Sequence, residues 1–287
     1  MAAQQQDSLP GTLSVGVLGL GAMGGPIARH LLRAGHDVGV LDLDDTAVQA
    51  ATSAGARAYQ DPAALARAHP VVLVVLPTDE DVRTACLGEV GLLVGTGPGS
   101  VVVICSSVRP ETCREVSDSA PPGTAVIDAA LTGGVRGAES AQVNLLVGGD
   151  PADLERARPA LEPWTSAVHL LGPLGSGQVG KTANNLVHWA QICAITEALE
   201  LARRAGLSVP TLRRALMDGP TDSRTLRELE QMRLTWHAKD LANTADLAER
   251  VGMDTPVART ARTVMARTTV ASVAALLSAT GEPEHHP

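Results

Sequence analysis

Residues 13–35 read LSVGVLGLGAMGGPIARHLLRAG. The short apolar run Leu13–Leu18 ends at a cluster of glycines, and Ala22–Ala34 carries apolar residues at helical spacing until Gly35 ends it. The stretch therefore predicts a buried strand, a tight turn and a helix. A strand and a helix joined in this way are typical of the start of a βαβ unit.

The turn contains Gly19, Leu20, Gly21, Ala22, Met23 and Gly24, which form a G-x-G-x-x-G pattern. The pattern alone is weak evidence in a chain with 28 glycines, and an ordinary glycine-rich turn is the alternative. Its place between a strand and a helix favours a dinucleotide site. Gly19 would permit the tight turn, Gly21 the approach of a pyrophosphate, and Gly24 the close packing of helix on strand.

An acidic residue, Asp42, follows the next predicted strand, Asp37–Leu41. A carboxylate at this point accepts hydrogen bonds from the ribose hydroxyls of adenosine and repels a 2′-phosphate. Asp44 is better placed to cap the following helix, Asp44–Ala54, which leaves Asp42 for the ribose. We therefore expect NAD as the cofactor, with NADP less favoured.

Predicted strands and helices alternate as far as Leu171. Further strands are predicted at Val71–Leu76, Ser100–Cys105, Thr124–Asp128, Val143–Val147 and Ala167–Leu170. Further helices are predicted at Asp79–Leu87, Pro110–Ser119 and Pro151–Leu161. This alternation predicts an α/β fold, a Rossmann-like doubly wound parallel sheet with helices on both faces.

After Gly175 the pattern becomes helical throughout. The predicted helices are Gln178–Ala205, Val209–Met217, Ser223–Arg233, Lys239–Val251 and Pro256–Leu277. We therefore expect a nucleotide-binding domain at residues 12–173 and an all-helical C-terminal domain at residues 174–280. The tails, residues 1–11 and 281–287, are polar, and we expect them to be disordered.

Charge and cysteine content exclude several classes of protein. The net charge is −8 and no basic run occurs, so neither nucleic acid nor an anionic membrane is an expected partner. No apolar run is long enough to span a bilayer, and the N-terminus has no signal-peptide pattern. The four cysteines form no C-x-x-C pair, so we expect no metal, but buried free thiols in the cytoplasm.

Lysine is scarce in this chain. Lys181 and Lys239 are the only lysines among 23 basic residues. Arginine stays protonated in proteins, whereas a buried lysine can give up its proton, so a retained lysine suggests proton transfer. Two leftover surface lysines are the alternative.

Lys181 lies in the segment Gly177–Asn185, one helical turn before Asn185. An ammonium and a carboxamide on one helix face can hold a hydroxyl or carbonyl oxygen between them. His188 and Trp189 continue that face. A polar helix start packed against the first domain is the alternative interpretation.

Five segments follow one another in an order that resembles the β-hydroxyacid dehydrogenases. They are Gly19–Gly24, Leu76–Glu80, Asp128–Ala138, Gly177–Asn185 and Lys239–Leu241. That family includes 3-hydroxyisobutyrate dehydrogenase, tartronate semialdehyde reductase and the glyoxylate/succinic semialdehyde reductases. The resemblance extends from about Ser14 to about Ala266.

The resemblance implies a role for each matching residue. Lys181 matches the catalytic lysine, and Asn185 matches an asparagine that helps to bind the substrate. Thr132, Gly133 and Gly134 match the loop that holds the substrate carboxylate, where Ser is usual in place of Thr132. Cofactor contacts are implied for Leu76, Pro77 and Ser107, and Lys239 matches a lysine near both nicotinamide and substrate. Ile104, where relatives often have Asp, and a shortened Asp218–Trp236 depart from the family pattern.

The expected reaction transfers a hydride between NAD and a small anionic 3-hydroxy carboxylate, or reduces the matching semialdehyde. Lys181 would be the general acid/base, which requires a pKa well below its ordinary value. We also expect a homodimer or homotetramer through the C-terminal domain, because Gln178–Ala205 is apolar over a wide arc. The alternatives are an imine reductase, whose relatives generally lack the lysine, and a catalytically idle NAD-binding module.

Overall fold

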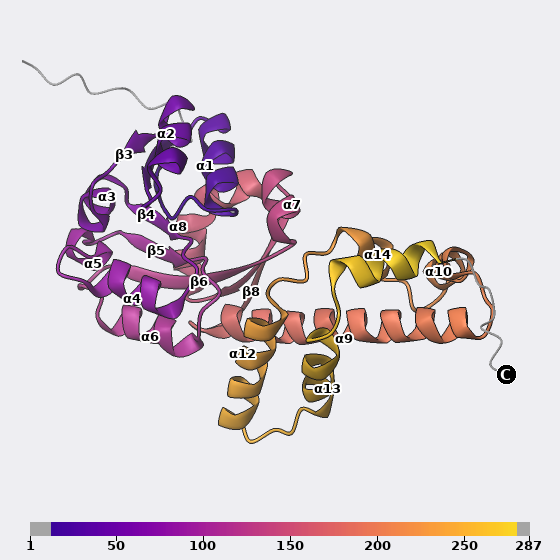
Figure 1. The fold of residues 1–287 in the computed structure, drawn as a ribbon. Helices are drawn as coiled ribbons and strands as arrows, with labels where there is room; N and C mark the ends of the chain where they lie inside the picture. Colours follow the sequence, from indigo (N-terminus) through magenta and orange to yellow (C-terminus); the bar gives the residue numbers. More distant parts are fainter. Residues whose placement is uncertain (1–12, 280–287) are drawn as a thin grey trace, which may run out of the picture. The chain divides into compact units, whose positions relative to one another are not determined.

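A computed structural model describes residues 13–279 (Figure 1). The tails for which we expected disorder, residues 1–11 and 281–287, lie outside the described residues. The chain forms two compact units that meet inside helix α9 (Ser176–Arg204). The first unit ends at Lys181, and the second begins at Thr182.

An eight-stranded sheet forms the centre of the first unit, in the order β3-β2-β1-β4-β5-β6-β7-β8. The strands are β1 (Ser14–Leu18), β2 (Asp37–Leu41), β3 (Arg57–Ala58), β4 (Val71–Val74), β5 (Val101–Ile104), β6 (Ala125–Thr132), β7 (Val143–Gly148) and β8 (Thr165–Gly172). The strand order reverses between β1 and β4. Ligands bind at such a topological switch point, outside the carboxyl ends of the strands.

Side chains alternate between the two faces of the sheet. On β5, Val101 and Val103 join one apolar core, whereas Val102 and Ile104 join the other. One face is covered by α1 (Gly24–Arg33), α2 (Asp45–Ser53), α7 (Gly134–Glu139) and α8 (Pro151–Leu161). The opposite face is covered by α3 (Pro62–Ala68), α4 (Asp79–Leu87), α5 (Leu92–Gly95) and α6 (Pro110–Asp118) (Figure 1). The predicted doubly wound fold is confirmed.

The sheet is not parallel throughout, contrary to expectation. Strands β1 to β6 pair in parallel, but β7 runs antiparallel to β6, and β8 is parallel to β7. The connection from β6 to β7 contains only the short helix α7. Such a connection is too short for the crossover that a parallel pair requires, so the chain turns back beside β6.

The second unit contains helices. After the remainder of α9 come α10 (Val209–Met217), α11 (Arg224–Arg227), α12 (His237–Arg250), α13 (Pro256–Met265) and α14 (Val270–Ser278). Trp189, Ile192 and Leu199 of α9 are buried, and the first two pack in a core with Leu241 and Met265. Among the residues that the structure describes, no helix is both long and apolar enough to cross a membrane.

Two predicted helices of the second unit are interrupted. The helix predicted at Pro256–Leu277 is two helices, α13 and α14. Thr269 and Ser272 form a capping box that starts α14, and such reciprocal bonds begin a new helix rather than continue an old one. The helix predicted at Ser223–Arg233 is reduced to α11 and one short 3-10 turn.

Candidate functional site

The positions predicted to bind the cofactor lie at the carboxyl ends of four neighbouring strands. The glycine turn follows β1, Asp42 follows β2, Leu76 and Pro77 follow β4, and Ser107 follows β5. These strands are adjacent and parallel, so their ends share one edge of the sheet, and the strand order reverses there. This arrangement is typical of a dinucleotide site.

The glycines of the turn differ in what surrounds them. Gly19 has a φ of +98°, which favours glycine, and a Cβ at Gly24 would collide with the carbonyl oxygen of Gly19. A Cβ at Gly21 would meet nothing within 4 Å. The protein itself therefore needs Gly19 and Gly24, whereas Gly21 leaves open space. That space suits a pyrophosphate at the N-terminus of α1.

The Asp42 carboxylate is fixed beside this turn. One oxygen accepts a hydrogen bond from the backbone N–H of Leu20, and the other accepts one from the N–H of Asp44 at 2.8 Å. Asp44 itself caps α2 by accepting from the N–H of Thr46 at 2.9 Å, which confirms the predicted cap. Leu43, which directly follows Asp42, is fully exposed and apolar, so it offers no charge for a 2′-phosphate.

A buried serine joins the ends of β4 and β5. The Ser106 hydroxyl donates to the carbonyl of Val74 at 3.2 Å and accepts from the backbone N–H of Leu76 at 2.7 Å. These two hydrogen bonds connect the loop after β4, which carries Leu76, to the loop after β5, which carries Ser107. Both residues are predicted cofactor contacts.

A buried glutamine connects the loop after β5 to the start of α9. The side chain of Gln178 is 1% exposed; it donates to the carbonyl of Ser106 at 3.0 Å and accepts from the N–H of Val108 at 3.2 Å. Neither Ser106 nor Gln178 has a role predicted from the sequence. Neither has a local signal, because the hydrogen bonds join segments that are far apart in the chain.

Asp128 on β6 is fully buried beneath the same helix start. Its carboxylate accepts from the backbone N–H groups of Gly175 at 2.6 Å and Gln178 at 2.8 Å. Gly148 and Gly177 make room for it, because a Cβ at either position would meet its oxygens. Burial raises the pKa of Asp128 to about 6, against the opposing effect of the backbone hydrogen bonds. From the sequence, Asp128 was the end of a predicted strand and the first residue of a family segment, with no role of its own.

The predicted substrate loop continues from the end of β6. The Thr132 hydroxyl donates to the backbone carbonyl of Asn144 on β7 and accepts from the Asn144 side chain, both at 3.0 Å. Gly133 and Gly134 are exposed and have φ angles of +104° and +62°. The hydroxyl of Thr132 is therefore engaged with β7, while the two glycines present their backbone.

Glycines also let α9 lie directly on the sheet. A Cβ at Gly177 would meet the Leu146 carbonyl, and one at Gly180 would meet side chains of Leu146 and Leu171. The first turn of α9 therefore lies against Asp128 of β6, Leu146 of β7 and Leu171 of β8. Lys181, half-buried, directly follows Gly180 on this helix.

The remaining predicted residues belong to the second unit. Asn185 is buried on α9, one turn after Lys181, and Lys239 lies in the first turn of α12. His188 and Trp189 have partners within this unit: His188 Nδ1 lies 3.2 Å from the Thr225 hydroxyl, and the Trp189 indole donates to Asp240 at 3.0 Å.

The structure gives no support to thiol or metal chemistry. The four cysteines are free and buried, as predicted, and burial raises the pKa of Cys86 and of Cys105 to about 12. Thiols of this kind are poor nucleophiles. Within residues 13–279, no group of three or more His, Cys, Asp or Glu residues is placed to hold a metal ion.

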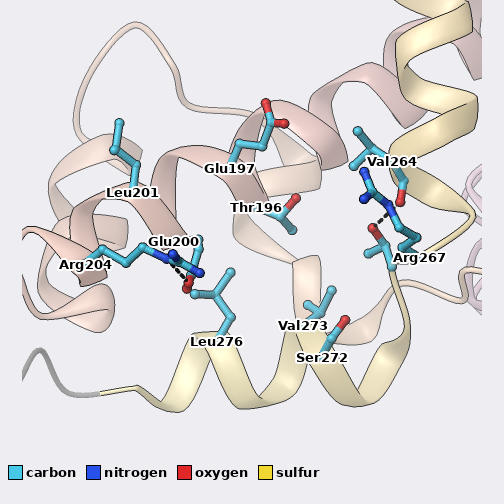
Figure 2. Close-up of a pocket in the computed structure, with 11 residues that line it drawn as sticks. Thr196, Glu197, Glu200, Leu201, Arg204, Val264, Arg267, Ser272, Val273 and Leu276 are labelled. Atoms are coloured by element: carbon cyan, nitrogen blue, oxygen red, sulfur yellow. Dashed lines mark hydrogen bonds and ion pairs between the residues drawn. The ribbon is translucent and has the colours of Figure 1, made fainter. Parts of the chain in front are cut away.

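A groove of about 510 Å³ opens in the second unit, and Figure 2 shows its lining. It lies among α9, α13 and α14 and contains none of the predicted site residues. Glu200 in this groove is hydrogen-bonded to Arg203 and Arg204, which lowers its pKa to about 2. Because the predicted residues lie elsewhere, we place the candidate site at the sheet edge and the start of α9.

Comparisons with known proteins identify the family of the chain. The chain matches the family described as the NAD binding domain of 6-phosphogluconate dehydrogenase over residues 14–172. Residues 175–276 match the family described as NAD-binding of NADP-dependent 3-hydroxyisobutyrate dehydrogenase. The chain belongs to the β-hydroxyacid dehydrogenase family.

Individual members of the family are similar over most of the chain. A 3-hydroxyisobutyrate dehydrogenase of Pseudomonas aeruginosa is 36% identical, over 69% of this chain and 67% of its own. The 2-hydroxy-3-oxopropionate reductase of Escherichia coli is 31% identical over 85% and 87%. The solved Mycobacterium tuberculosis 3-hydroxyisobutyrate dehydrogenase with L-serine has a TM-score of 0.83 at 29% identity, covering 93% of this chain and all of that one. As a β-hydroxyacid dehydrogenase, this protein is an NAD(P)-dependent enzyme.

The surroundings of Gly21 and Gly24 predict opposite consequences of the same substitution. Gly21→Ala fills open space, so we expect the free energy of unfolding to stay within about 0.5 kcal/mol of the unmodified protein. NADH affinity should fall on the order of tenfold, about 1.4 kcal/mol. Gly24→Ala should instead reduce the free energy of unfolding by about 1–3 kcal/mol, because the new Cβ meets backbone.

Urea unfolding and NADH fluorescence titration separate these two effects. Tight NADH binding by Gly21→Ala, measured under conditions where the variant is folded, would show that the dinucleotide does not lie against this turn.

Proposed function

We propose that the protein oxidises a small 3-hydroxy carboxylate with NAD⁺ to the corresponding semialdehyde or keto acid, and catalyses the reverse reduction. The observation that supports the proposal is the attachment of α9, which carries Lys181, to β6, which leads to Thr132: Asp128 of β6 accepts hydrogen bonds from Gly175 and Gln178 at the start of the helix. A proton acceptor and a loop suited to a carboxylate thus come from elements that pack together.

The carboxyl edge of the sheet would hold the cofactor. Gly19–Gly24 would receive its pyrophosphate, Asp42 its adenosine ribose, and the loops with Leu76, Pro77 and Ser107 would lie beside it. NAD⁺ bound there would accept the hydride from the carbon that bears the substrate hydroxyl.

Lys181 would act on the substrate oxygen. Its Nζ takes the hydroxyl proton as the carbonyl forms, and returns a proton to that oxygen in the reverse reaction. Asn185, one turn further along α9, would donate a hydrogen bond to the substrate. The backbone of Gly133 and Gly134 would bind the carboxylate, and Lys239 would supply positive charge in a protein of net charge −8.

The names of the relatives support this substrate class. They refer to 3-hydroxyisobutyrate, to 2-hydroxy-3-oxopropionate and, in one solved complex, to L-serine. Each is a small carboxylate with oxygen on the β-carbon. An imine reductase is not favoured, since Lys181 is present and these relatives act on hydroxy acids. Turnover of any such acid in a panel assayed with NAD(H) and NADP(H) would exclude an idle module.

Cofactor preference tests the role of Asp42. We expect NAD to exceed NADP in kcat/KM, because a carboxylate held beside the turn repels a 2′-phosphate. Asp42→Ala should reduce the ratio of kcat/KM with NAD to kcat/KM with NADP. The measurement is kcat/KM with each cofactor for both proteins, and equal or better use of NADP by the unmodified enzyme would contradict this assignment.

The role of Lys181 is tested by separating charge from proton transfer. Lys181→Arg keeps the positive charge but cannot accept a proton at neutral pH, so kcat should fall on the order of 10²–10⁴-fold, about as far as in Lys181→Ala. Lys181→Met, uncharged and of similar length, controls for the bulk of arginine. NADH affinity should remain unchanged in all three variants. Near-normal turnover in Lys181→Arg would transfer the assignment to Lys239 or His188.

We further propose a cytoplasmic homodimer or homotetramer built on the second unit. Free buried thiols suit a reducing compartment. On α9, Val187 is 57% exposed and Leu201 is 72% exposed, so apolar surface remains for a second copy to cover. Light scattering at micromolar concentration should give a multiple of the 29.6 kDa chain mass. A monomeric mass would overturn this part of the proposal.

A further inference from the structure

We infer that Asp128 is a positioning residue, whose carboxylate fixes the first turn of α9 and thereby sets where Lys181 stands relative to the loop Thr132–Gly134. The inference rests on the proposed function, in which Lys181 moves the proton. Asp128 itself lies beneath the helix and would not touch the substrate.

Asp128 links the two elements that carry the two parts of the proposed site. It lies on the strand that ends at Thr132, and its two oxygens accept from Gly175 and Gln178 at the beginning of α9. Gln178 is less than one helical turn before Lys181. One carboxylate therefore connects the strand that leads to the substrate loop with the helix that carries the proposed proton acceptor.

The contact restricts the helix in more than one direction. The hydrogen bonds fix its depth on the sheet, and Gly177 and Gly148 leave only enough room for the carboxylate between them. Gln178 adds a separate attachment, to Ser106 and Val108. Since the helix is tied at its first turn, a small shift there would carry Lys181 with it.

Stability at neutral pH does not explain a carboxylate at this place. Burial raises the pKa of Asp128 to about 6, so its ionised form is disfavoured in the folded protein. The stabilising contribution of such a group is complete below the pKa of the unfolded chain and is lost as the pH rises through about 6. What the ionised group does supply is two acceptors for two backbone N–H groups, together with a favourable charge at a helix N-terminus.

Asp128→Asn is the sharpest variant. It keeps the shape of the side chain but replaces one acceptor by an NH₂ group that faces a backbone donor. The lost hydrogen bond and the removal of a buried charge have opposite effects on stability, so we expect the variant to fold. We expect kcat to fall on the order of 10–100-fold, with the Kd for NADH within about twofold of the unmodified value.

Two further variants make the test specific. Gly177→Ala disturbs the same contact from the helix side without changing any charge, because the new Cβ would meet the Asp128 carboxylate as well as the Leu146 carbonyl. Asp61→Asn is the matched control: Asp61 caps α3 and accepts from the N–H of Ala64 at 2.7 Å, but lies on a helix that carries none of the proposed site. Gly177→Ala should also lose turnover, and Asp61→Asn should not.

A second readout needs no substrate. The chain has two lysines, so reductive ¹³C-methylation gives one resonance for Lys181 and one for Lys239, besides that of the N-terminus. Asp128→Asn and Gly177→Ala should move the Lys181 resonance and leave that of Lys239 unchanged.

The two hypotheses fail in different ways. If the unmodified protein turns over no hydroxy acid in the panel, the proposed function fails while the resonances still test the positioning. If kcat per folded site is unchanged in Asp128→Asn and Gly177→Ala, or falls equally in Asp61→Asn, or if the Lys181 resonance does not move, the positioning role is overturned.

Discussion

The carboxylate of Asp128 is the interaction on which the arrangement of the first unit's functional end depends. Taking a carboxylate out of water costs several kcal/mol unless hydrogen bonds replace its hydration. The rise of its pKa from 3.8 to about 6 corresponds to about 3 kcal/mol against the ionised form at neutral pH. The rest of the desolvation cost of the carboxylate is offset by the backbone N–H groups at the start of α9 and by the helix dipole. In the folded chain this group is satisfied by the start of α9, which lies over the middle of β6.

Glycine supplies the space that this arrangement requires. Gly148 and Gly177 surround the carboxylate, and Gly180 lets α9 approach Leu146 and Leu171. After β1, Gly24 lets α1 meet the glycine turn. At Gly24 and Gly177 the absent Cβ lets backbone approach a backbone carbonyl, and at Gly148 and Gly180 it makes room for neighbouring side chains. Around Asp128, the glycines that allow close approach therefore lie beside the carboxylate that fixes the helix start.

Much of this could be predicted from the sequence, and the failures have physical reasons. The glycine turn, Asp42 and the strands after it lie within a continuous stretch whose periodicity carries the signal. The antiparallel direction of β7 was not predicted, because hydrophobic periodicity carries no information on strand direction. The short connection after Thr132 is the feature that indicates it. The break before α14 depends on one capping box at Thr269. Ser106 and Gln178 act across long sequence separations, so no local pattern indicates them.

These differences divide the site into two kinds of residue. Groups that would meet the cofactor follow strand ends, where the fold itself brings them together, and short motifs are enough to find them. Among the groups that would meet the substrate, Lys181 depends on how α9 starts, and in our proposal Asp128 and Gln178 fix that start without taking part in the chemistry. A substitution at either residue is expected to move Lys181 while the residues that would meet the cofactor stay in place. Turnover is therefore expected to depend on contacts beneath the helix as well as on the residues that line the site.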